Sequence, residues 1–209
     1  MNITSQQIAM WSTLPDLRNI GKAVDQIDNA LRQLAHSSPE IFLTDISSET
    51  EKLSKDTKRM LVDFRLSVEY NNILWSSLFI SCFSILEAML DALCDHYCKD
   101  KKLVLKPNDL REKGIVRSQK YLTAVVGVPF PTNTIYWNNI LKTRLIRNCL
   151  AHVNGVVDQT EKPGSLLTYV RQHPKLVGIN HGRLFVSKEL PIVFSQWGVK
   201  LSDFLTKNN

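Results

Sequence analysis

Hydrophobic and polar positions recur at helical spacing through much of the chain. Between residues 16 and 35, apolar side chains return every three or four positions, which predicts an amphipathic helix. This stripe consists of Ile20, Val24, Ile27, Leu31 and Leu34. A polar connection follows at 36–49, so the next helix is expected to begin near its end. Its N-cap is expected among Asp45, Ser47 and Ser48.

The segment from about 49 to 99 contains neither proline nor glycine, which predicts one very long helix or two nearly collinear ones. Its most apolar part, 73–86, is shorter than the roughly 20 residues that span a bilayer. This part also carries four serines. We therefore expect a buried core helix and no membrane association. One line of small and acidic side chains along this helix would let another helix approach closely. It consists of Ser77, Ser81, Ser84, Ala88, Asp91 and Asp95.

The second half is irregular at 100–135, where a short helix is expected around 118–126. A helix is predicted at 135–153, ending at Asn154-Gly155 because glycine suits the left-handed position after a helix. Three β-prone pieces and a last helix follow, at 167–170, 175–179, 183–187 and 191–206. Asn180-His181-Gly182 resembles a hairpin turn. The pattern predicts a mainly α helical bundle with a small C-terminal β-hairpin and a terminal helix.

The bulk properties agree with one globular unit. The chain has 209 residues, 44% hydrophobic and 22% charged, which excludes a disordered or fibrous protein. We expect an N-terminal helical segment, 1–55, packed on a core domain, 56–209. The net charge of +6 permits polyanion partners without requiring them. The first residues show no export signal, so a cytoplasmic location is expected.

Four cysteines are present, and three of them fall in one predicted helix, so reduced thiols are expected. Cys94, His96 and Cys98 lie close together, but no second Cys/His pair follows at zinc spacing. We therefore expect no metal site and no cofactor.

The stretch "RLIRNCLAHVNG", residues 144–155, carries the candidate chemistry. On a helical wheel its apolar residues share one face, and Arg147 and His152 lie on opposite margins of the other face. A guanidinium holds phosphate oxygens, and an imidazole moves protons near neutral pH, so the pair suits a phosphodiester. Because the two residues diverge on one helix, we expect a second copy about a two-fold axis to bring them together. The alternative is a solvated helix face whose Arg pairs with any carboxylate.

"RNCLAH" is similar to the R-x4-H form of the HEPN superfamily signature, including the polar Asn148 after the Arg. The long preceding helix with its acidic residue in "SILEAML", and "YWNNILKTRLIRN" before the motif, also resemble that family over residues 60–160. The resemblance implies a helical bundle, a homodimer with a composite cleft, and metal-independent RNA cleavage. Many members are toxins or phage-defence effectors, some neutralised by an antitoxin protein. By this match Arg147 and His152 are the catalytic pair and Asn148 positions them.

Supporting residues are expected on neighbouring segments. Glu87 stands among apolar residues and needs a partner, which Arg144 or Arg147 would supply, either as a structural ion pair or to orient the catalytic Arg. A basic run is either a solvated segment or a surface that steers RNA phosphates. The residues expected to bind RNA in this run are Lys101, Lys102, Arg117 and Lys120.

The function expected from these features is a metal-independent endoribonuclease of a toxin–antitoxin or phage-defence system. Two alternatives remain open at this point. One is a non-catalytic HEPN-like dimerisation module that binds RNA, a nucleotide or a protein partner through the same cleft. The other is a purely structural helical protein, which would have no affinity for RNA.

Overall fold

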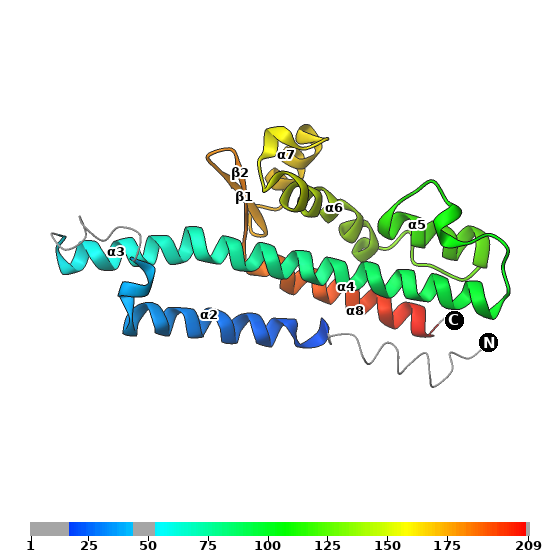
Figure 1. Ribbon diagram of the computed structural model, residues 1–209, viewed down its shortest axis with the longest axis horizontal. Coiled ribbons are helices and arrows are strands. Elements are labelled where there is room, and N and C mark those ends of the chain that lie inside the picture. The colour runs from blue at the N-terminus through cyan, green and yellow to red at the C-terminus, as the bar shows by residue number, and fades with distance from the viewer. Residues whose placement is uncertain (1–16, 44–52, 208–209) are drawn as a thin grey trace.

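The computed structural model describes residues 17–43 and 53–207 (Figure 1). The described chain is mainly α-helical, with one antiparallel two-stranded hairpin followed by a terminal helix, so the predicted fold class is confirmed. The helix start expected among Asp45, Ser47 and Ser48 lies outside the described residues.

The N-terminal part forms a helical hairpin. A 3₁₀ turn, Leu17–Asn19, leads into α2, Ile20–Ser37, which packs against the terminal helix α8, Glu189–Lys207. A second short turn, Pro39–Phe42, precedes α3, Lys55–Arg65. α3 begins where the hydroxyl oxygen of Ser54 accepts a hydrogen bond from the Thr57 amide, as an N-cap does. A small separate core joins α2 to α3; it consists of Ala35, Phe42, Val62 and Leu66.

The predicted long helix is present. α3 continues through a π-helical turn, Leu66–Tyr70, into α4, Asn71–Asp100. The buried face of α4 packs on α8 and on α6, Ile135–Val153. Phe79 of α4 meets Phe194 of α8 edge to face at 5.3 Å between ring centroids. This is the packing of a core helix.

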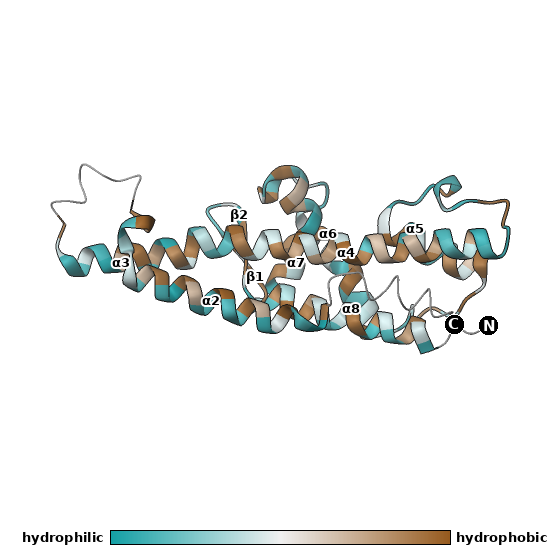
Figure 2. Ribbon diagram, turned by 60° about the horizontal axis from the view of Figure 1, so that its bottom comes forward, coloured by the Kyte–Doolittle hydropathy of each residue, from teal (hydrophilic) through white to brown (hydrophobic). Residues whose placement is uncertain are grey.

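The opposite face of α4 is left open. Ser77, Ser81, Ser84 and Ala88 of the small-residue stripe are exposed, and no described helix of the chain covers them. Figure 2 shows apolar and polar positions alternating along this helix. Within the described residues, Lys55–Asp100 is also the one helix long and apolar enough, by length and composition, to span a membrane.

The segment between α4 and α6 is more helical than its sequence suggests. A 3₁₀ turn, Pro107–Asp109, precedes α5, Gly114–Lys120, which continues as a π-helical turn, Tyr121–Val126. The short helix expected around 118–126 is therefore present and begins four residues earlier. α6 then ends as predicted, with Asn154 and Gly155 both left-handed at φ 49° and 76°.

One β prediction is wrong. Residues 167–170 belong to a helix, α7, Pro163–Gln172, which follows a 3₁₀ turn, Val157–Gln159. Pro163 fits the first helical position, and Leu166 and Tyr169 are buried at helical spacing. The other two β-prone pieces form the predicted hairpin of β1, Val177–Asn180, and β2, Arg183–Val186. His181 and Gly182 make its tight turn, with φ of 47° and 74°.

The hairpin is tied to both α4 and the end of α6. Asn72 of α4 accepts a hydrogen bond from the Val186 amide at 2.9 Å and donates one to the Leu184 carbonyl at 3.4 Å. On the same strand, the Leu184 amide donates to the Gly155 carbonyl at 2.8 Å. The open edge of β2 is therefore paired at both places.

Candidate functional site

A polar cluster forms where the last turns of α6 lie beside α4. Nη1 of Arg147 lies 3.2 Å from the Asn148 side-chain oxygen and 3.4 Å from Nε2 of His152. Nη2 of the same Arg lies 3.5 Å from Oε2 of Glu87 on α4. The structure thus brings Arg147, Asn148, His152 and Glu87 together within one chain.

The expected divergence of Arg147 and His152 is wrong. Five residues on a helix are about 7.5 Å apart along the axis. The Arg side chain is long enough to reach the imidazole, because side chains at the far end of the interval lean back toward the helix N-terminus. Because an Arg can only donate, this contact is a hydrogen bond when Nε2 of His152 is the acceptor.

Glu87 is bounded on two sides. Besides its contact with Arg147, its Oε1 lies against Gly114, the first residue of α5, which has a φ of +59°. A Cβ placed on Gly114 would be 2.5 Å from that oxygen. A side chain at position 114 would therefore be strained by the backbone conformation and would displace the carboxylate. This contact is not visible in the sequence, since 26 residues separate the two positions.

The guanidinium of Arg147 packs on an aromatic ring, but not all of its N–H groups are hydrogen-bonded. Its Cζ lies 5.8 Å from the centroid of the buried Phe83 ring, a cation–π contact. Its buried Nε has no hydrogen-bond partner among the described residues. The contacts to Glu87 and His152 are at the long end of hydrogen-bond distances, so the group can exchange them for a stronger acceptor. A phosphate, with its anionic oxygens, is such an acceptor.

Arg144, the other supporting Arg expected here, takes no part in this cluster. It is half-buried, and no described side chain pairs with it. Of the two Arg residues expected as partners of Glu87, Arg147 therefore forms the ion pair and Arg144 does not.

Three of the four residues expected to bind RNA are engaged with their own chain. Arg117 donates to Asp91 at 2.8 Å and to Asn108 at 2.7 Å. Lys120 pairs with Glu112 at 2.6 Å. The ammonium of Lys101 donates to the Val126 carbonyl at 2.9 Å and lies over the Tyr97 ring. Lys102 is exposed in a turn, and its ammonium has no partner in the described part of the chain. RNA binding by these four residues stays a prediction.

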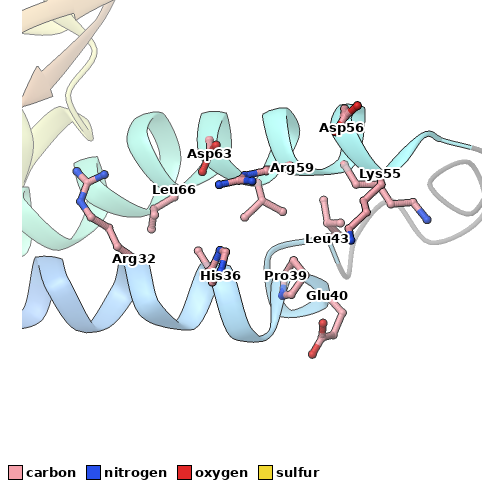
Figure 3. Close-up of a pocket in the computed structure, with 13 residues that line it drawn as sticks. Arg32, His36, Pro39, Glu40, Leu43, Lys55, Asp56, Arg59, Asp63 and Leu66 are labelled. Atoms are coloured by element: carbon pink, nitrogen blue, oxygen red, sulfur yellow. The ribbon is translucent and has the colours of Figure 1, made fainter.

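A cavity of about 1060 Å³ lies elsewhere, between α2 and α3 (Figure 3). Its floor includes Ala35, Val62 and Leu66, and charged side chains surround it. Arg59 and Asp63 project from α3, and Arg32 and His36 from α2. None of the residues expected at the RNA site lines this cavity.

The four cysteines form no disulfide. Burial raises the pKa of the Cys82 thiol to about 11 and that of Cys94 to about 12. Burial also raises the pKa of Cys149, whereas Cys98 is partly exposed. Among the described residues, no group of three or more His, Cys, Asp or Glu side chains is arranged to hold a metal.

Comparison of the chain with protein families, with curated proteins and with solved structures finds no match. The assignment of function therefore depends on the chemistry of the polar cluster.

Proposed function

We propose that the protein is a metal-independent, HEPN-like endoribonuclease, with Arg147 and His152 as its catalytic pair. The observation that carries this proposal is the 3.4 Å contact of the guanidinium with the imidazole on an exposed helix end. A cation that stabilises a phosphorane and a base that accepts a proton are then available at one point. The resemblance of "RNCLAH" to the family signature supports the same assignment.

In the proposed reaction, the phosphate at the cut position takes the place of His152 on the Arg147 guanidinium, while Glu87 keeps its contact with Nη2. Nε2 of His152, free of Arg147, accepts the proton of the ribose 2′-hydroxyl. The 2′-oxygen forms a bond to phosphorus, and the bond from phosphorus to the 5′-oxygen breaks. The leaving oxygen takes up a proton, returned by the imidazolium. The products are a 2′,3′-cyclic phosphate end and a 5′-hydroxyl end.

Asn148 and Glu87 act as positioning residues in this scheme. The Asn148 side-chain oxygen holds Nη1 of Arg147, and Glu87 holds Nη2 from the opposite helix. With two of its edges fixed, a guanidinium loses less conformational entropy when it binds a phosphate. Replacement of Glu87 should therefore raise KM more than it lowers kcat.

A homodimer is part of the proposal. The exposed small-residue line on α4 runs past Glu87, with Ser84 and Ala88 on either side of it in sequence. Small side chains allow a second helix to come close, and Ile73, 68% exposed on the same helix, would be buried by it. Two copies joined there would set two Arg147–His152 pairs along one cleft. In a toxin–antitoxin or phage-defence setting, a further partner would be an antitoxin that covers this cleft.

The test is RNA cleavage by purified protein in the presence of EDTA. A general base contributes roughly 10² to 10⁴ in rate, so His152→Ala should lower kcat at least about 100-fold. His36→Ala, an exposed histidine of the α2–α3 cavity, is the matched control and should cleave like the wild type.

Equal cleavage by wild type and His152→Ala, or loss of wild-type cleavage in EDTA, would contradict the proposal. RNA binding that depends on Arg147 without any cleavage would favour the alternative, a non-catalytic RNA-binding module.

A further inference from the structure

A basic surface lies on α7 and the β-hairpin. Residues 162–188 contain five Lys or Arg and no Asp or Glu. Over 27 residues this is an uninterrupted block of one charge sign, and such a block attracts polyanions. The basic segment at 99–120 has the same net charge, because its eight Lys or Arg are offset by three acidic residues, Asp100, Asp109 and Glu112.

Most of the charged side chains of this surface form no ion pair. Lys162, Arg171 and Lys175 are exposed, and their side chains have no ion-pair or hydrogen-bond partner among the described residues. Arg183 is exposed too, and its one described partner is a neutral carbonyl. Lys188 is the exception, because it pairs with Asp28 at 2.9 Å. Four cations on this surface are therefore uncompensated.

The surface is joined directly to the end of the helix that carries His152. Nη1 of Arg183 donates to the carbonyl of Asn154, two residues after the imidazole, at 3.0 Å. The backbone adds the bond from Leu184 to Gly155 and a second one, from the Val157 amide to the Gly182 carbonyl, at 3.0 Å. α7 itself packs on α6. Arg183 therefore lies beside the end of α6, and α7 lies against the same helix.

We propose that the surface formed by Lys162, Arg171, Lys175 and Arg183 binds the phosphodiester backbone of the RNA strand next to the cut position. This inference rests on the proposed function for the identity of the strand. It assigns binding to α7 and the hairpin, beside the end of α6, whereas Arg117 and Lys120 of the segment at 101–120 are ion-paired within the chain.

The experiment compares two triple charge reversals, each made in the His152→Ala background so that RNA is bound and not cut. The test variant carries Lys162→Glu, Arg171→Glu and Lys175→Glu. The control variant carries Lys22→Glu, Lys200→Glu and Lys207→Glu, with the same change in net charge. These three lysines are exposed on α2 and α8, which lie across α4 from α7 and the hairpin (Figure 1 and Figure 2).

Binding of a fluorescent single-stranded RNA of about 20 nucleotides is measured by anisotropy at several salt concentrations. The plot of log K against log salt has a negative slope, and each lost phosphate contact makes it shallower by about 0.7 for a single strand. Loss of three contacts makes it shallower by about 2. The test variant should bind at least about tenfold more weakly at moderate salt, and the control within about twofold of its parent. Thermal melting of both variants confirms that they are folded.

Equal weakening in both variants, or an unchanged Kd and slope in the test variant, would overturn the proposed surface. Its failure is distinguishable from failure of the nuclease proposal. If the test variant binds RNA normally while His152→Ala abolishes cleavage, only the surface is wrong. If the test variant loses binding although the wild type cleaves no RNA, the surface stands and the catalytic proposal is wrong.

Discussion

Gly114→Ala tests the contact that fixes Glu87. The substitution acts in two ways, because the residue has a φ of +59° and because its new Cβ would lie 2.5 Å from Oε1 of Glu87. A left-handed conformation costs an L residue about 1–2 kcal/mol. The close contact costs less in stability, since the carboxylate is the end of a flexible side chain and can turn away. The Glu87 carboxylate then loses its contact with Arg147.

The magnitude follows from these two terms. For a chain of 150–250 residues, 1 kcal/mol lowers Tm by about 2–4 °C, so the backbone term alone predicts a decrease of about 2–8 °C. Loss of the partly buried pair of Glu87 with Arg147 adds up to about 1 kcal/mol. Thermal unfolding followed by circular dichroism measures the sum.

A double-mutant cycle with Glu87→Ala separates the two terms. Without the carboxylate, Gly114→Ala should cost the backbone term alone, so the two substitutions together should destabilise less than their sum, by about 1 kcal/mol. Additive effects within about 0.5 kcal/mol would refute the claim that Gly114 holds Glu87 in place. An unchanged Tm in the single variant would refute the backbone argument as well.

Three further outcomes follow from the structure. Asn72→Ala leaves the Val186 amide without its acceptor, so unfolding in urea should show a loss of about 1–3 kcal/mol, and a loss under about 0.5 kcal/mol would mean that water replaces the side chain. Burial by itself raises the pKa of Asp28. The hydrogen bond from Lys188 and the nearby cations lower this pKa by a larger amount, so it lies below its ordinary value. This carboxylate therefore adds stability above about pH 4 that disappears as the pH falls through its folded pKa, and Asp28→Asn should flatten the acid limb of the stability curve. Thiol labelling of the native protein at neutral pH should modify Cys98 first, and equal rates at all four cysteines would contradict the burial of the other three.

Local patterns in the sequence were sufficient for most of the helices and for the hairpin. The end of α6 follows from Asn154-Gly155, and the hairpin turn from His181-Gly182, because both depend on backbone conformations that few residues adopt. Residues 167–170 of α7 have the composition of a strand, and a four-residue piece fits either period; Pro163 is the signal that distinguishes the helix.

The sequence predicts which residues belong to the candidate site, but not how they contact one another. The spacing of Arg147 and His152 is a local property, but their contact depends on the reach and direction of the Arg side chain. The partners of Glu87 and Arg117 lie far along the chain, and no periodicity encodes such contacts. For that reason Gly114 and the pairing of the basic segment were found only in the structure.

Arg147 and His152 belong to one helix of one chain, and this has a consequence for complementation. Subunits of Arg147→Ala mixed with subunits of His152→Ala would still lack an intact pair in every copy. In the proposed nuclease each active centre would come whole from a single polypeptide, so a mixture of the two defective proteins should regain no activity.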